Sequence, residues 1–330
     1  MNKVDSKHMY EVYDNWPEII EGILERDFRK LEYSGIDHIV FAGMGGSGAL
    51  GDIFASISSK SNIHVSVIKG YLLPKTVDKN TLVVTTSVSG NTVETLNVLK
   101  SAEKMNCQLI AFSSGGKMIE FCEKYKIEYR KITQHHSPRA SFAGFLFSML
   151  KVLKPVIPIE NVDIYEALNE VKKLHKKINS GNLNEDNPSL KLAMWLQEIP
   201  LIYYPWGLQS AAIRFKNSLQ ENTKLHAMSE DIVEACHNGI VSWEKKSIIQ
   251  PILIKGKDDY IKTKERWNIL EEYFTEKQID YKIVDSVEGN VLSKLSHLIY
   301  LLDYASIYKA ILTKIDPSPI SSIDFIKKRL

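Results

Sequence analysis

Two short loops combine glycines with hydroxyl side chains in a way that suits anion binding. Residues 43–48 read GMGGSG and lie between an apolar run and a helical pattern, and residues 87–92 read SVSGNT in the same kind of position. Glycines let the backbone approach a ligand closely, and the start of a helix presents free N–H groups to an anion. Ser87, Ser89 and Thr92 add hydroxyl donors. We therefore predict that the two loops form a neutral cradle for a phosphate monoester.

Each loop has an alternative interpretation. The glycine loop formally fits the G-x-G-x-x-G dinucleotide motif, but a nicotinamide site needs an acidic residue near the end of the next strand, and residues 63–70 read IHVSVIKG without one. This excludes the dinucleotide interpretation. The alternative interpretation of the serine loop is that Asn91 or Thr92 only caps the following helix. Capping accounts for one side chain, whereas the loop has several hydroxyls, so a phosphate site is favoured.

The elements that must position these loops follow from an alternation of short apolar runs and helical patterns, which is typical of a parallel sheet. The first half predicts a helix over 16–33, strands at 38–42, 64–68, 82–86, 108–112 and 128–131, and a last helix over 141–153. Five parallel strands with helices between most of them make one αβα sandwich. Both loops would then open at the carboxyl edge of the sheet, where ligands bind in such folds.

A second domain is predicted after residues 154–158, which read KPVIP and favour an extended connector. The limits are an N-terminal domain over 1–153, a linker over 154–162 and a C-terminal domain over 163–330. The second half predicts strands at 201–204, 224–228, 248–254 and 281–285, and helices over 209–220, near 231–235, over 259–277 and over 291–313. The fold class is therefore α/β, with two αβα sandwich domains and parallel sheets.

Composition excludes several other classes of protein. The 330 residues carry 42 basic and 40 acidic side chains, so a net charge of +2 provides no strong field for nucleic acid or an anionic membrane. The three cysteines, Cys107, Cys122 and Cys236, fit neither a disulfide framework nor a metal site. No apolar run approaches the roughly 18 residues of a membrane span, and the start lacks the apolar core of a signal peptide. We expect a folded cytoplasmic protein without a metal, nucleic-acid or membrane partner.

Five separated patches resemble the bifunctional phosphoglucose/phosphomannose isomerases, a mainly archaeal branch of the phosphoglucose isomerase superfamily that is built on sugar isomerase (SIS) domains. The patches are residues 43–52, 87–96, 137–142 and 214–224 with His237-Asn238, and the C-terminal tail. The resemblance covers nearly the whole chain. It implies two SIS-type, flavodoxin-like domains. It also implies an aldose–ketose isomerase of glycolysis and gluconeogenesis, which interconverts glucose 6-phosphate, and mannose 6-phosphate, with fructose 6-phosphate through a cis-enediol, without a cofactor.

The resemblance also implies roles for individual residues. Glu221 matches the base that moves one proton between C1 and C2, and Arg139 matches the cation that stabilises the enediolate. His237 matches the histidine that assists ring opening and is donated by the neighbouring subunit of a homodimer. Lys327 matches a tail lysine that returns to the active site and acts on the sugar ring, with Lys328 as the alternative register. The implied phosphate and substrate-loop residues are Ser47, Ser87, Ser89, Thr92, Gly45 and Gly46.

Taken alone, some of these residues have ordinary structural interpretations. A glutamate at a helix end is usually a solvated surface residue. Judged by residue type alone, Glu198 and Glu230 are equally good candidates for the base as Glu221. Arg139 would by default pair with a carboxylate such as Glu120. The neighbouring Arg214, Asn217 and Asn222 fit the family pattern, and this favours Glu221 as the base.

Two departures and two rival functions stay open. The chain has Val88 where the family often has an aromatic residue, and Ile320 where a threonine is expected for accepting mannose 6-phosphate. One rival is a non-catalytic sugar-phosphate regulator, but the first 35 or so residues are too few and too acidic for a DNA-binding helix-turn-helix. The other is an aminosugar-phosphate isomerase, which would need a source of ammonia.

Overall fold

Two parallel sheets organise the chain in the computed structural model, which describes residues 1–29 and 31–329. Asn15–Tyr165, together with the residues from Ser321 onward, form one compact unit around five strands. Met1–Asp14 and Glu166–Ile320 form a second unit around four strands. The division falls within α7 (Asn161–Ile178), just after the linker predicted over 154–162, whose first residues form the 3₁₀ helix η1 (Lys154–Val156). The predicted domain limits stay a prediction.

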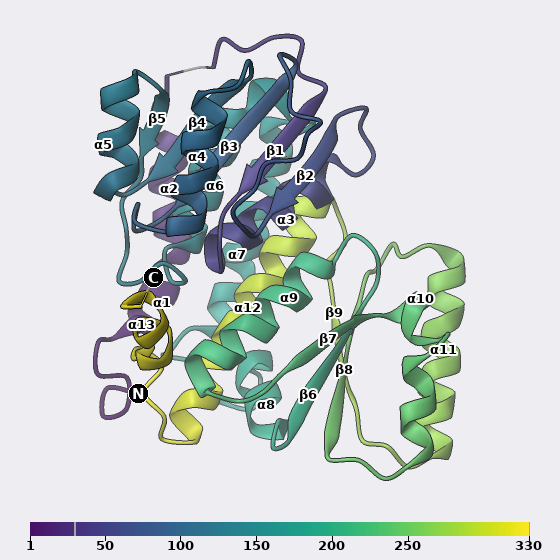
Figure 1. The fold of residues 1–330 in the computed structure, drawn as a ribbon. Helices are drawn as coiled ribbons and strands as arrows, with labels where there is room; N and C mark the ends of the chain where they lie inside the picture. Colours follow the sequence, from purple (N-terminus) through teal and green to yellow (C-terminus); the bar gives the residue numbers. More distant parts are fainter. Residues whose placement is uncertain (30, 330) are drawn as a thin grey trace. The chain divides into compact units, whose positions relative to one another are not determined.

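The five-stranded unit is a doubly wound sheet with the order β2-β1-β3-β4-β5, all strands parallel (Figure 1). Its strands are β1 (His38–Ala42), β2 (His64–Ile68), β3 (Thr81–Ser87), β4 (Gln108–Ser113) and β5 (Glu128–Lys131). Its longer helices are α2 (Trp16–Glu25), α3 (Gly46–Ser58), α4 (Val93–Glu103), α5 (Gly116–Tyr125) and α6 (Phe142–Leu153). Every residue of β1 and β3 is buried, as expected for central strands covered on both faces. The five predicted strands are confirmed to within one residue at each end.

The helix predicted over 16–33 is too long, because α2 ends at Glu25 and Arg26 is extended. The cause lies in a distant part of the chain. The Lys151 ammonium of α6 donates hydrogen bonds to the carbonyls of Leu24 (2.7 Å) and Arg26 and lies 3.4 Å from that of Ile23. A cation that binds the last carbonyls of a helix replaces the next turn as their partner.

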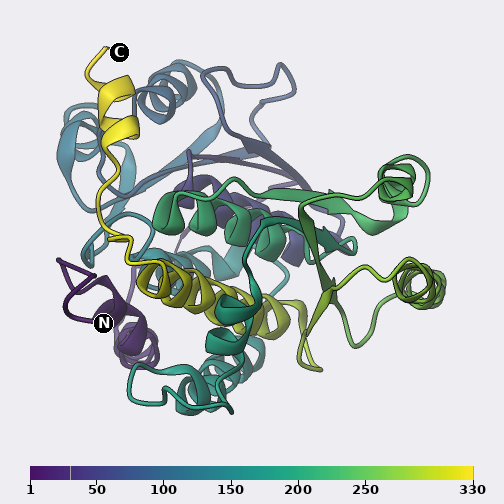
Figure 2. The ribbon, with the colours of Figure 1, turned by 90° about the horizontal axis from the view of Figure 1, so that it is seen from below.

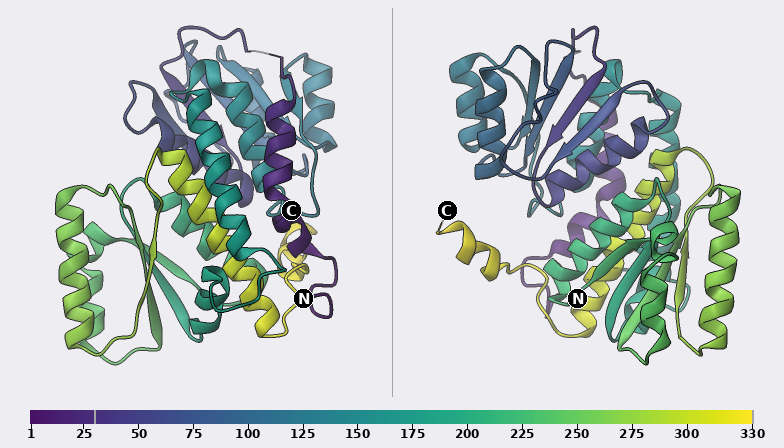
Figure 3. Two further views of the ribbon diagram at one scale, coloured as in Figure 1. Left: turned by 180° about the vertical axis from the view of Figure 1, so that it is seen from behind. Right: turned by 45° about the vertical axis from the view of Figure 1, so that its right-hand side comes forward.

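The four-stranded unit has a parallel sheet in the order β7-β6-β8-β9. Its strands are β6 (Ile199–Tyr204), β7 (Met228–Asp231), β8 (Ile249–Lys255) and β9 (Lys282–Asp285). Its helices include α1 (Met9–Asp14), α8 (Pro188–Trp195), α9 (Gln209–Ser218), α10 (Ile232–Ala235), α11 (Ile261–Glu276) and α12 (Val291–Leu312). Helices α8 and α9 pack on α12, while α10 and α11 cover the opposite face of the sheet (Figures 2 and 3). The predicted second αβα sandwich is thereby confirmed.

The strand predicted over 224–228 is displaced, because β7 begins only at Met228. Helix α9 continues into a π-helical turn, η2 (Leu219–Thr223), and the turn ends at Lys224 with a left-handed φ of +62°. The amide of Leu225 then donates to the Thr223 hydroxyl at 3.2 Å. This backbone is curled rather than extended, so pairing with β6 starts at Met228, opposite Leu201.

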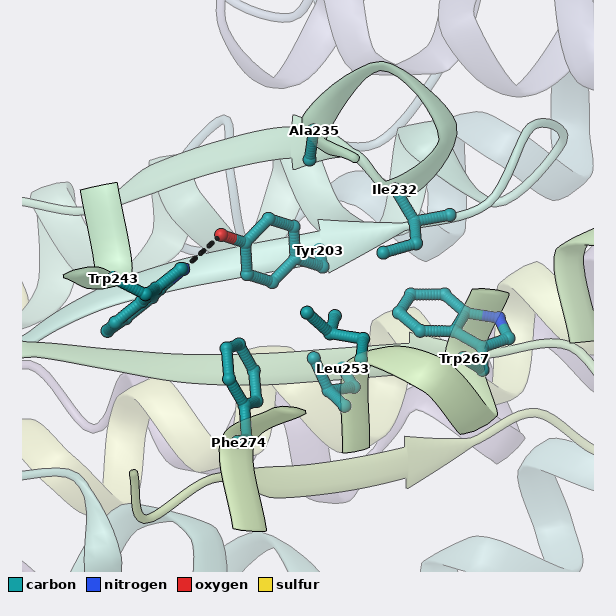
Figure 4. Close-up of a cluster of buried hydrophobic side chains, with 8 residues drawn as sticks. Tyr203, Ile232, Ala235, Trp243, Leu253, Trp267 and Phe274 are labelled. Carbon is teal, nitrogen blue, oxygen red and sulfur yellow. Dashed lines mark hydrogen bonds between the residues drawn. The ribbon is translucent and has the colours of Figure 1, made fainter. Parts of the chain in front are cut away.

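An aromatic core fills the space between β6, β8, α10 and α11 (Figure 4). Phe274, fully buried, contacts Trp243 edge-to-face with ring centroids 5.2 Å apart. The Trp243 indole donates a 2.9 Å hydrogen bond to the Tyr203 hydroxyl, and burial raises the pKa of Tyr203 to about 12. The phenol therefore stays neutral and satisfies the indole N–H inside the core.

Helix α12 explains why the first 14 residues belong to this unit. The Tyr304 hydroxyl donates to the Asp14 carboxylate, and the Tyr300 hydroxyl donates to the Tyr13 carbonyl at 2.7 Å. Ser180, just after α7, donates to Asp14 through its amide at 2.9 Å and its hydroxyl at 2.5 Å. These buried contacts hold α1 against α12. Neither α1 nor its attachment is predicted from the sequence.

Candidate active site

The glycine loop joins β1 to α3 in a backbone shape that requires glycine. Gly45 has a φ of +53°, and a Cβ atom at Gly43 would lie 2.8 Å from the backbone carbon of Ser47. The Ser47 amide donates to the Met44 carbonyl at 3.0 Å, so the chain turns sharply into the helix. Ser47 is buried in the first turn of α3, beside Gly46. The loop thus presents backbone rather than bulky side chains at the carboxyl end of β1.

The serine loop joins β3 to α4 and is held by hydrogen bonds within itself. The hydroxyls of Ser87 and Thr92 lie 2.9 Å apart, and the Gly90 amide donates to the Ser87 hydroxyl at 3.1 Å. The Asn91 amide donates to the Ser89 hydroxyl at 3.3 Å. These bonds bring the Ser87 and Thr92 hydroxyls together at the start of α4 and fold the Ser89 hydroxyl against the Asn91 amide. Because β1 and β3 are paired, with Ala42 opposite Thr85, the two loops leave neighbouring strands at the same edge.

Helix capping does not account for the serine loop. Thr92 occupies the N-cap position of α4, but its side chain makes no capping hydrogen bond and contacts Ser87 instead. The Asn91 side chain accepts from the Lys117 amide at 3.2 Å and donates to the Ser89 carbonyl at 3.0 Å. Side chains that normally bind the first N–H groups of a helix are therefore engaged elsewhere. The first N–H groups of α4 have no intrahelical carbonyl partner, which suits an incoming anion.

Arg139 lies just before α6 in a segment fixed by Ser141. The Ser141 hydroxyl donates to the carbonyls of His135 and Ser137 at 2.9 and 2.8 Å and accepts from the His135 amide at 2.9 Å. Only 4% of the Arg139 surface is exposed. Among residues 1–29 and 31–329, the exposed Glu120 on α5 forms no ion pair. Glu120 is therefore not the partner of Arg139, and the broader alternative, a structural pairing of Arg139 with another carboxylate, stays untested.

Glu221 lies in the π-helical turn η2, a rare conformation that is frequent at functional sites. Buried hydrogen bonds to α12 hold the residues just before this turn and the turn itself. The Asp303 carboxylate accepts from Arg214 Nε at 3.0 Å and from the Ser218 hydroxyl at 2.7 Å. The Asn222 side chain donates to the Ser306 hydroxyl at 2.8 Å. Glu221 itself is partly exposed, and its backbone is held by the contacts of its neighbours Ser218 and Asn222.

The C-terminal tail starts beside the same turn. The Lys224 ammonium donates to the Glu221 carbonyl at 2.5 Å and to the Pro319 carbonyl at 2.8 Å. Ser6 donates to Asp316 at 2.5 Å, which secures the tail from the other side. Beyond it, α13 (Ser321–Lys327) carries the predicted Lys327, whose side chain is exposed.

His237 is exposed just after α10, in an acidic neighbourhood. A Cβ atom at Gly239 would lie 2.7 Å from the Glu230 carboxylate, so that carboxylate lies against the turn after His237. Burial, followed by the charges of Glu234 and Asp231, raises the pKa of Glu230. The neighbouring Asn238 side chain donates to Glu234 at 2.7 Å, which orders the turn.

Comparison with known proteins decides the family. A model of the bacterial phospho-glucose isomerase C-terminal SIS domain matches residues 185–330. The bifunctional phosphoglucose/phosphomannose isomerase of Caldicellulosiruptor bescii is 30% identical over 334 residues, covering 98% of each chain. The chain belongs to the bifunctional phosphoglucose/phosphomannose isomerase family.

The chain is also similar to a protein with a different name and to a solved structure of low sequence identity. A protein named D-glucosamine-6-phosphate 4-epimerase, from Sulfolobus acidocaldarius, is 25% identical over 322 residues and covers 97% of each chain. The crystal structure of a hypothetical protein from Thermus thermophilus superposes with a TM-score of 0.74 at 14% identity, covering 97% of this chain and 89% of that one. The latter shows a shared fold only.

The predicted site residues of this phosphoglucose/phosphomannose isomerase family member fall into two groups. The phosphate and substrate-loop residues lie in the five-stranded unit, together with Arg139, and the two loops end on paired strands. Glu221 and His237 lie in the four-stranded unit. In the described part of the chain, no three His, Cys, Asp or Glu residues gather as metal ligands. Among the same residues, no helix is both long and apolar enough to span a membrane.

Two supporting residues escape the sequence analysis. Lys69 follows β2, pairs with Asp52 of α3 at 2.6 Å, and would lie 3.2 Å from a Cβ at Gly48. The sequence contains a signal for Lys69, because it stands near the end of residues 63–70, the segment where a dinucleotide site would have an acidic residue. Asp303 has no such signal, since it is 89 residues from its partner Arg214.

Gly90→Ala tests the serine loop. Gly90 has a φ of +69°, and an added Cβ would lie 1.7 Å from the Gly115 carbonyl oxygen, so the loop must open. We expect a loss of about 1–3 kcal/mol in the free energy of unfolding, measured in urea, and a raised KM for sugar phosphates. Gly70→Ala is the matched control, because nothing lies within 4 Å of its Cβ position. Equal behaviour of the two variants would contradict the assigned loop geometry.

Proposed function

We propose that the chain is an aldose–ketose isomerase that interconverts glucose 6-phosphate and fructose 6-phosphate, and mannose 6-phosphate and fructose 6-phosphate. One observation carries the proposal: in a member of this isomerase family, the serine loop leaves α4 without a side-chain cap and brings the Ser87 and Thr92 hydroxyls to within 2.9 Å of each other, with Ser89 in the same loop. Such a site suits a phosphate monoester, which is the group shared by all three sugars.

The isomerisation needs few protein groups. A base removes the proton at C2 of the aldose and returns it to C1, which passes through a cis-enediol, and Glu221 is assigned this step. Arg139 is assigned the stabilisation of the charge that develops on the enediolate oxygen, because a buried guanidinium is always charged. His237 and Lys327 are assigned to opening of the sugar ring. No redox or organic cofactor is needed, because the substrate is oxidised at one carbon and reduced at its neighbour.

The direct test is conversion of the substrates. EDTA-treated protein is incubated separately with glucose 6-phosphate and mannose 6-phosphate, and fructose 6-phosphate is measured. We expect both to be converted. If only glucose 6-phosphate is converted, the proposed activity is limited to glucose 6-phosphate and fructose 6-phosphate. If neither sugar phosphate is converted, the proposed isomerase activity is refuted. A melting temperature that still rises with either sugar phosphate would then favour a non-catalytic binding protein.

The similarity to a D-glucosamine-6-phosphate 4-epimerase favours a second candidate, the 4-epimerisation of an aminosugar phosphate. The same incubation with glucosamine 6-phosphate, analysed by proton NMR at C4, separates the two. A change in configuration at C4 without formation of ketose would favour this candidate over the isomerase.

Ile320→Thr tests substrate choice. Ile320 follows Pro319, whose carbonyl is held by Lys224 beside the Glu221 turn. A hydroxyl here would offer a hydrogen bond to a sugar hydroxyl, so we expect kcat/KM for mannose 6-phosphate to rise about tenfold relative to glucose 6-phosphate. Ile323→Thr, in the exposed tail, is the control and should leave the ratio unchanged. An unaltered ratio in Ile320→Thr would remove this residue from the specificity site.

We propose a homodimer in which His237 acts in the site of the neighbouring subunit. His237 is exposed and so available to a second chain. Glu221→Gln and His237→Ala should each be inactive, but subunits mixed after mild dissociation should regain about one quarter of wild-type activity, because each mixed dimer has one intact site. No recovery from confirmed mixed dimers would show that His237 acts within its own chain.

A further inference from the structure

The four-stranded unit contains a cavity that none of the candidate active-site residues line. Its volume is about 420 Å³, and its walls come from α7, α8, β9 and α12. The sheet order ends at β9, so no strand in the described chain pairs with its outer edge. The side chains of an edge strand are accessible at that edge, and Ile283 is accordingly 39% exposed. The unpaired edge therefore leaves room for the cavity.

The cavity has an apolar floor and a basic rim. Leu174, Leu192 and Leu301 form the floor and are all buried. The rim carries three exposed lysines and one carboxylate, namely Lys177, Lys191, Lys282 and Asp285. Within residues 1–29 and 31–329, none of these lysines has an ion-pair partner. A cleft with an excess of one charge raises the local concentration of the opposite ion.

His297 contributes a neutral aromatic ring to the wall. Its Nδ1 is buried and has no hydrogen-bond partner among the residues that the structure describes. Burial lowers the pKa of His297 to about 4, with Glu170 opposing and the Lys177 charge reinforcing the shift. The ring is therefore neutral at pH 7 and has one N–H donor and one acceptor. Because Nδ1 has almost no accessible surface, His297 contributes the rest of its neutral ring to the cavity wall and not this nitrogen.

The cavity and the Glu221 turn use different faces of α12. His297 and Leu301 are four residues apart and therefore share one face, which lines the cavity. Asp303 and Ser306, which hold Arg214 and Asn222, lie on another face. Changes to the cavity rim are thus separable from changes to the candidate active site.

We propose that this cavity binds a small organic anion, with a carboxylate, sulfonate or phosphate at the lysine rim and an apolar body against the leucine floor. The floor contributes by burial of apolar surface, and the rim selects negative charge. The site is independent of the isomerase assignment, since it shares no residue with it.

Two dyes with related ring systems test the proposal. The probe 1-anilinonaphthalene-8-sulfonate carries one sulfonate, and N-phenyl-1-naphthylamine has the same rings without charge. Both are titrated by fluorescence into the full chain and into Lys177→Glu/Lys282→Glu. The matched control is Lys176→Glu/Lys277→Glu, which has the same charge change at exposed positions outside the cavity. Circular dichroism verifies the fold of each variant.

We expect the sulfonate probe to bind wild type and to lose at least about tenfold in affinity in the rim variant only, with the uncharged probe unaffected. Absence of sulfonate binding to wild type, equal loss in the control, or displacement of the dye by fructose 6-phosphate would each overturn the proposal. If the rim variant also loses affinity for the uncharged probe, both probes are titrated into Lys177→Gln/Lys282→Gln, which removes the two positive charges without adding negative ones. Undiminished sulfonate binding there would overturn the proposal, and a selective loss of the sulfonate probe would support it.

Discussion

Glu221→Gln is expected to lower kcat for the conversion of glucose 6-phosphate by about 100- to 10,000-fold, the usual contribution of a general base. Glutamine has nearly the same shape but cannot accept the C2 proton. The backbone of the turn should persist, because Asn222 and Ser218 hold it to α12 without the Glu221 carboxylate. Fructose 6-phosphate should therefore still raise the melting temperature of the variant.

Solvent deuterium gives the mechanistic readout. In D2O, exchange of the proton held on the base should place deuterium at C1 of the fructose 6-phosphate that wild type forms from glucose 6-phosphate, and Glu221→Gln should lose this labelling and the isomerisation in parallel. Glu198→Gln, at an exposed position just before β6, is the matched control and should behave like wild type. Near-normal turnover in Glu221→Gln would assign the base elsewhere, and Glu230, whose pKa is raised mainly by burial, would be the next residue to test.

Asp303→Asn is expected to be the most destabilising single change, by about 3–5 kcal/mol in the free energy of unfolding. Asp303 is fully buried and its carboxylate lies 2.5 Å from the Arg214 guanidinium, which is itself 3% exposed. An asparagine removes the Asp303 counter-charge from this buried cation, so less of the cost of its desolvation is offset. Urea unfolding followed by circular dichroism measures the change, and kcat should fall because the Glu221 turn loses its support.

Asp258→Asn provides the matched control for this loss. Asp258 pairs with Lys294 at 2.6 Å, but its carboxylate is 61% exposed and solvent screens the pair. Its urea midpoint should stay close to that of wild type. The double variant Arg214→Met/Asp303→Leu should regain most of the stability while activity stays low, because it removes both buried charges together. If Asp303→Asn were as stable as Asp258→Asn, the buried ion pair would not be a determinant of stability.

The fold class and the positions of the two loops could be predicted from the residues alone. Short continuous apolar runs between helical patterns located the strands of the first sheet, because central strands that are buried on both faces need apolar residues throughout. The glycines at 43, 45 and 90 marked the loops, because an added Cβ would clash at Gly43 and Gly90 and the positive φ of Gly45 would strain another residue. The family motifs pointed to Glu221 and Arg139 in the same local way. The roles of these residues, and of His237 and Lys327, stay predictions.

The distant groups that hold these motifs could not be predicted from the residues alone. Lys151 ends α2 by binding its last carbonyls, and the π-helical turn delays β7 to Met228. Asp303 neutralises Arg214 across 89 positions of the chain. Sequence periodicity reports which face of an element is buried, whereas a buried hydrogen bond or ion pair depends on which element it meets. Polar partners of this kind are fixed by packing, so they became visible only in the folded chain.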